Sequence, residues 1–140
     1  MFEGRAICSP LHGLVNADFV AQGLLFALAG CAASRALAHP ARHALAAAAL
    51  VNGVGIALVG LVPENAATPA VHALGATLAI VAGNATALVS AFAFRELGLP
   101  RVHRLASLAL PGLAAAALAM LVVARSRGAP ALLPDGVWER

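Results

Sequence analysis

Residues 43–63, HALAAAALVNGVGIALVGLVP, form a long apolar run that contains no Asp, Glu, Lys or Arg. The hydrocarbon core of a bilayer is about 30 Å thick, and roughly 20 helical residues cross it. The run is rich in Ala and Leu and lacks the strict alternation of a membrane strand. A helix also satisfies its own backbone hydrogen bonds in lipid. The stretch therefore predicts a transmembrane helix.

Three further windows outside this run are free of charge. The segments between the windows carry Pro or Gly, which end helices. We therefore predict an all-α fold, an integral membrane four-helix bundle that forms one membrane domain over residues 1–140, with an N-terminal segment 1–14 and a tail 125–140. The predicted helices cover about 15–34, 43–62, 71–94 and 105–124, with Pro63 after the second, Pro69 at the start of the third and Pro111 inside the fourth.

Composition supports a membrane protein. Hydrophobic residues make up 61% of the chain and charged residues 11%, and the mean hydropathy is +0.89. A soluble domain is usually near half apolar and a quarter charged. With so few polar residues, a chain of this length cannot cover a water-facing surface. The lipid bilayer is thus the first partner that the sequence predicts.

The basic residues are nine arginines with no lysine, grouped at the edges of the apolar runs. Such groups anchor helices at lipid headgroups, whereas nucleic-acid binding needs a basic stripe on a soluble face, so no nucleic-acid partner is expected. Loops 35–42 and 95–104 hold five arginines against four on the opposite side. The positive-inside rule then places these two loops in the cytoplasm and the protein in the cytoplasmic membrane, with both termini outside.

Small residues are frequent within the predicted helices. Gly and Ala let membrane helices approach closely, which is the usual way they associate. We therefore expect a compact pair of helical hairpins. A biased genome composition is the alternative explanation for so much Ala and Arg.

The outer end of this topology collects polar side chains from two segments. His12 and Asn16 lie four residues apart, on one face of a helix that begins near His12. The candidate ligand or metal-binding residues are His12, Asn16, Asp18, Glu64 and His72. The alternative for Asn16 or Asp18 is a cap on the first helix.

Glu64 and His72 flank the turn between the second and third helices and can meet across it. With His12 they would form a His/His/carboxylate set that binds a divalent metal. The spacing matches no metal motif such as HExxH. In the alternative, Glu64 is solvated and His72 hydrogen-bonds to the loop. The metal and any other cofactor remain unknown from sequence.

Asn52 and Asn84 lie well inside the second and third predicted helices. Polar side chains at such depth usually hydrogen-bond to other helices, at about 0.6 kcal/mol on average. In adjacent antiparallel helices the two asparagines can meet near mid-membrane. A substrate path is the functional alternative.

Two blocks, GRAICSPLHGLVNADFVAQGLL (4–25) and VGLVPENAATPAVHALGATLAIVAGNATAL (59–88), suggest a family. They resemble a domain-of-unknown-function family of bacterial and archaeal multi-pass membrane proteins, family nine-nine-eight. The matching features are Ser9, Pro10, His12 and Asn16, then Gly60, Pro63, Glu64 and His72, then Gly83 and Asn84. Members have about six membrane helices, so the resemblance implies that this chain lacks the first and last. It implies no activity.

The sequence contains no nucleotide-binding loop and no GxSxG, CxxC or HExxH motif. We therefore expect a non-enzymatic membrane protein that binds a lipid or small molecule or supports a membrane complex. The partner would be a second copy of the chain or another membrane protein. The alternatives are a metal-assisted membrane hydrolase that uses the outer His and Glu residues, and half of a small transporter.

If the outer cluster is a binding site, native mass spectrometry of the gently purified protein will show a discrete extra mass of a metal or a lipid. The substitution His72→Ala will remove that mass, because it deletes one ligand. A bare monomer or dimer that the substitution leaves unchanged would make Glu64 and His72 turn residues only.

Overall fold

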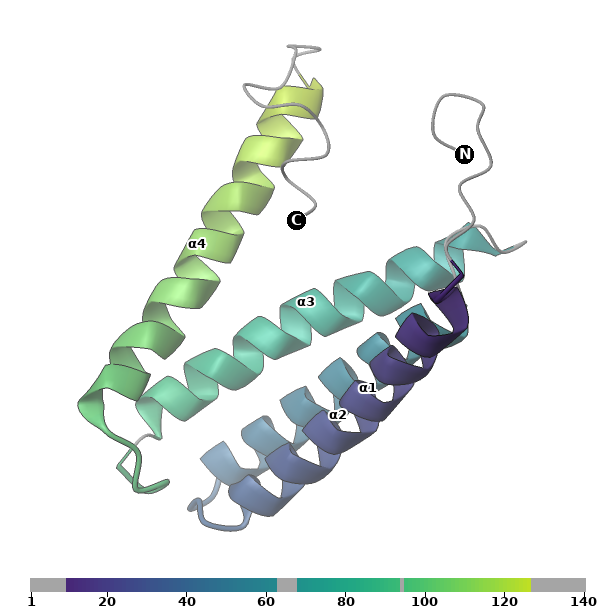
Figure 1. Cartoon of the computed structure of the whole chain (residues 1–140). Coiled ribbons are helices and arrows are strands. Elements are labelled where there is room, and N and C mark those ends of the chain that lie inside the picture. Colours follow the sequence, from purple (N-terminus) through teal and green to yellow (C-terminus); the bar gives the residue numbers. More distant parts are fainter. Residues whose placement is uncertain (1–9, 63–67, 94, 127–140) are drawn as a thin grey trace.

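The structure is a computed structural model that describes residues 10–62, 68–93 and 95–126. All regular structure within these residues is helical, and Figure 1 shows its arrangement. The four helices are α1 (His12–Ser34), α2 (Ala41–Leu61), α3 (Pro69–Phe92) and α4 (Arg101–Ser126). The predicted all-α fold with four helices is thus confirmed.

The helices start two to four residues earlier than the charge-free windows predict. The first turns of α2 and α4 contain Arg42 and Arg101, because arginine is a good helix former and does not end a helix. Pro69 occupies the first turn of α3, where its missing N–H costs nothing, and Pro111 lies inside α4 as predicted.

The start of α1 differs from one prediction. Leu11 occupies the N-cap position, and no side chain caps the helix there. Asn16 and Asp18 lie inside α1, more than one residue beyond the free amides of its first turn. The capping alternative for these two residues is therefore wrong.

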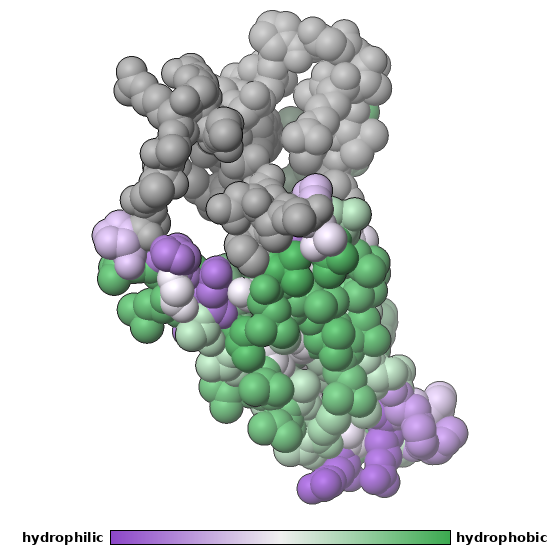
Figure 2. Space-filling model, turned by 90° about the vertical axis from the view of Figure 1, so that its right-hand side faces the viewer, coloured by the Kyte–Doolittle hydropathy of each residue, from purple (hydrophilic) through white to green (hydrophobic). Residues whose placement is uncertain are grey.

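Three helices, α1, α2 and α3, are long and apolar enough to cross a membrane. Their exposed positions are rich in Leu, Val and Ile, and an apolar surface extends along the molecule above a hydrophilic end in Figure 2. Few side chains are buried within the protein. This large exposed apolar surface is compatible with a lipid environment, which would cover it.

The helices pack in chain order. The helix α2 lies between α1 and α3, while α4 contacts α3 alone and diverges from the other helices in Figure 1. The expected compact pair of hairpins is thus wrong for the described residues, because α4 does not return to α1 or α2.

Glycines bring the backbones of the first three helices into direct contact. A Cβ atom added to Gly53 of α2 would lie 2.5 Å from the carbonyl oxygen of Gly23 in α1. On the other side of α2, a Cβ on Gly55 would lie 2.7 Å from the carbonyl oxygen of Gly75 in α3. Since real Cβ atoms do not approach backbone so closely, only glycine permits these helix pairs.

We predict that Gly53→Ala lowers the free energy of unfolding in detergent micelles by about 1–3 kcal/mol, as overpacking does in tight cores. The new methyl group must push α1 away from α2. Thermal or SDS-induced unfolding followed by circular dichroism measures the change.

Gly112→Ala is the matched control, because nothing lies within 4 Å of a Cβ at that position of α4. Its stability should stay the same or rise, since Ala favours helix over Gly. Equal stabilities of the two variants would contradict the close α1–α2 contact.

Candidate functional site

The two arginine-containing connections lie at the same end of the molecule, the lower end in Figure 1. The backbone N–H of Ala38 donates a hydrogen bond of 2.9 Å to Oε2 of Glu96. This bond joins the α1–α2 connection to the α3–α4 connection. Beside it, Leu37, Leu45 and Ala93 form a buried apolar cluster. The end that carries the arginines is therefore packed.

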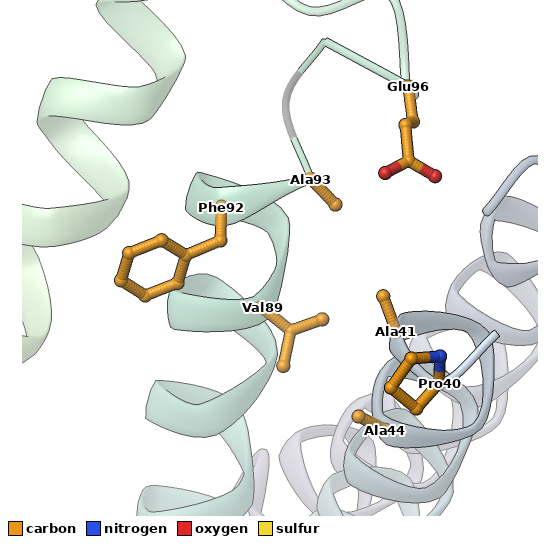
Figure 3. Close-up of a pocket in the computed structure, with 7 residues that line it drawn as sticks. All are labelled: Pro40, Ala41, Ala44, Val89, Phe92, Ala93 and Glu96. Atoms are coloured by element: carbon orange, nitrogen blue, oxygen red, sulfur yellow. The ribbon is translucent and has the colours of Figure 1, made fainter. Parts of the chain in front are cut away.

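A groove opens between α2 and α3 at this end (Figure 3). The first turn of α2 faces Val89 of α3 and Ala93, the residue that follows α3, and the carboxylate of Glu96 lies beside the gap in Figure 3. The groove has a volume of about 370 Å³ and is lined by Pro40, Ala41, Ala44, Val89, Phe92, Ala93 and Glu96. Its walls are apolar, with one charged group, which is the usual make-up of a small-molecule site.

The predicted outer cluster lies at the opposite end. His12 and Asp18 are exposed on α1, Asn16 is half-buried, and His72 is half-buried in the first turn of α3. Glu64 lies outside the described residues. No group of three or more His, Cys, Asp or Glu with metal-binding geometry occurs among the residues that the structure describes. The metal site that includes Glu64 thus stays a prediction.

His72 connects the ends of α2 and α3. Its Nδ1 lies 2.7 Å from the carbonyl oxygen of Val62, the residue that follows α2. A carbonyl only accepts, so Nδ1 carries the proton and donates it. This is the loop hydrogen bond that the sequence offers as an alternative to a ligand role.

The two asparagines within α2 and α3, Asn52 and Asn84, make different hydrogen bonds. Asn52 is buried, and its Nδ2 donates to the carbonyl oxygen of Ala79 in α3 at 2.6 Å. Asn84 donates to the carbonyl oxygen of Ile80 in its own helix at 2.8 Å. The two side chains therefore do not bond to each other. Asn52 has the interhelical role that its depth suggests, and its Oδ1 is buried without a hydrogen-bond partner.

A polar cluster that the sequence did not reveal joins α3 to α4. Nε2 of His103 lies 3.2 Å from Oγ of Ser90 and 3.2 Å from Oγ of Ser107. The Ser90 hydroxyl donates to the carbonyl oxygen of Ala87 at 2.8 Å, so its oxygen accepts from His103. Only the spacing of His103 and Ser107, four residues apart on one helix, was visible in the sequence.

This cluster does not have the arrangement of a serine nucleophile. Because the Ser90 hydroxyl donates to the carbonyl oxygen of Ala87, it does not offer its proton to Nε2 of His103 in this arrangement. Among the described residues, no carboxylate hydrogen-bonds to His103 to orient it. The cluster therefore links α3 to α4 through the hydrogen bond between Ser90 and His103.

Comparisons with known proteins found no match among protein-family models, curated proteins or solved structures.

We predict that Asn52→Ala lowers the free energy of unfolding by about 0.6 to 2 kcal/mol, the range for interhelical hydrogen bonds in membranes. The substitution removes the bond to Ala79 and loosens α2 from α3. Asn84→Ala is the matched control and should cost less, because the bond it removes lies within α3. SDS-induced unfolding measures both, and a larger loss for Asn84→Ala would contradict the assignment.

Proposed function

We propose that this chain is a non-enzymatic integral membrane protein that binds a lipid-like or small apolar molecule in the groove between α2 and α3. The observation that carries the proposal is the apolar groove with Glu96 at its edge. Its volume of about 370 Å³ lies within the range of small-molecule sites. The exposed apolar helices support insertion in a bilayer.

The orientation follows from the arginines. Both connections that contain arginines lie at one end and are joined by the bond between Ala38 and Glu96. We infer that this end faces the cytoplasm, that the membrane is the cytoplasmic membrane, and that α4 forms a fourth span. Membership of family nine-nine-eight fits the same topology and rests on the sequence resemblance.

The groove selects its ligand through shape and one acceptor. The carboxylate of Glu96 uses Oε2 for the N–H of Ala38 and retains further lone pairs. A head group that donates a hydrogen bond can pair with it while an alkyl chain covers Val89 and Ala44. A long-chain alcohol combines these two features and is a suitable probe.

We expect hexadecanol with a diazirine in its chain to crosslink to residues of the groove when the protein is reconstituted in vesicles. Ala44→Phe fills the groove and should reduce this labelling on the order of tenfold, a loss equivalent to about 1.4 kcal/mol of binding. Ala44 is exposed, so the larger side chain does not disturb a core. Mass spectrometry of the labelled peptides gives the positions.

Ala33→Phe is the control, because Ala33 is exposed in the last turn of α1 at the same end of the molecule and does not line the groove. Its labelling should equal that of the unsubstituted protein. Labelling spread evenly over the lipid-facing residues of all helices, or an equal loss in both variants, would exclude a specific site in the groove.

A further inference from the structure

A second groove, distinct from that between α2 and α3, lies at the start of α4. It has a volume of about 440 Å³ and is lined by Arg95, Arg101, Arg104, Leu105 and Leu108. Four of these residues, at positions 101, 104, 105 and 108, have the spacing of one helix face. Three guanidinium groups and two leucines therefore share a single surface. Neither the predicted outer cluster nor the proposed α2–α3 ligand uses it.

Along α4 the charged residues of the groove come first and the apolar residues follow, in the same order as the head and tail of a lipid. At 1.5 Å per residue, Leu108 lies about 10 Å further along the helix than Arg101. The arginines are at the helix end nearest the hydrophilic loops, and the leucines follow toward the apolar part. This spacing matches the step from a phosphate to the upper acyl chains of a phospholipid.

The groove opens away from the α3–α4 contact. On another face of α4, His103 hydrogen-bonds to Ser90 of α3, and Ser107 hydrogen-bonds to His103. Since α4 contacts no helix other than α3 among the described residues, no other helix covers the face with Arg104 and Leu105. Leu105 is 67% exposed. A lipid can therefore reach this surface from the bilayer.

We propose that this groove binds the headgroup of an anionic phospholipid, with the phosphate held by the three arginines and an acyl chain along Leu105 and Leu108. Guanidinium groups bind phosphate through paired N–H donors, and basic pockets beside membrane helices select anionic lipids. The amides in the first turn of α4 add positive potential. The proposal requires the membrane insertion proposed above but not the α2–α3 ligand.

The surrounding charges leave the groove positive. Arg95 and Arg104 each make a further interaction within the protein. A guanidinium stays positively charged whatever such interaction it makes, and it carries five N–H donors. The adjacent carboxylate of Glu96 accepts from Ala38 on the side of the α1–α2 connection and offsets one of the three charges.

The test uses the full chain in vesicles of equal parts phosphatidylglycerol and phosphatidylcholine. The substitution Leu108→photo-leucine places a diazirine in the groove. Leu110→photo-leucine places a diazirine at a residue of α4 that is 63% exposed and does not line the groove. We expect position 108 to label phosphatidylglycerol in excess, on the order of tenfold, and position 110 to label the two lipids nearly equally.

A pair of charge variants separates the groove from general attraction to the membrane surface. Arg101→Gln with Arg104→Gln should remove the excess at position 108. The control combines Arg35→Gln with Arg42→Gln, which removes two charges from the same end of the molecule outside the groove. This variant should keep the excess labelling of phosphatidylglycerol at position 108. Excess inorganic phosphate should leave the labelling unchanged, because the acyl chain contributes to binding.

Equal labelling of the two lipids at position 108 would overturn the proposal whether or not the charge variants fold. The proposal would also be overturned if both charge variants lost the excess labelling of phosphatidylglycerol alike, or if inorganic phosphate abolished that excess. Lipid labelling at position 110 reports membrane insertion independently. Failure of labelling at both positions would contradict insertion itself, whereas failure of selectivity at position 108 alone would leave the proposed function intact.

Discussion

The direct backbone contact of α2 with both neighbours is the constraint on which the rest of the structure depends. Lipid surrounds apolar helices as readily as other helices do, so packing requires surfaces that fit closely. Gly53 meets Gly23 on one side of α2, and Gly55 meets Gly75 on the other. Asn52 adds a hydrogen bond to Ala79 of α3, one helical turn from Gly75. Glycine thus fixes which helices are neighbours, although it contributes no side chain.

Only one of the two grooves depends directly on this arrangement. The groove beside Glu96 needs α2 and α3 held at a fixed separation, and the contacts of Gly55 and Asn52 supply it deeper in the same interface. The arginine groove needs only the start of α4 and the adjacent loop. The hydrogen bond between Ser90 and His103 connects this start of α4 to α3. The first site is therefore a property of a helix pair, and the second belongs to a single helix end.

The helices could be predicted because charge is costly in a bilayer, so the charge-free windows locate them within a few residues. Pro69 and Pro111 were also placed correctly from their backbone chemistry. The partners of polar side chains could not be predicted. The bond between Ala38 and Glu96 joins residues 58 positions apart, and that between Asn52 and Ala79 depends on helix rotation. The divergence of α4 could not be predicted either, because the charge-free windows do not tell which helices are neighbours.

Packing in chain order also has a consequence for synthesis. Each helix contacts only the helices directly before and after it in the described part of the chain. When α2 emerges, its partner α1 already exists, and the same is true for α3 and α4. No helix needs a helix that is synthesised later than its direct successor, so the helices can pack in the order in which the ribosome synthesises them. Such local topologies fold quickly, because little loop entropy must be overcome before contacts form.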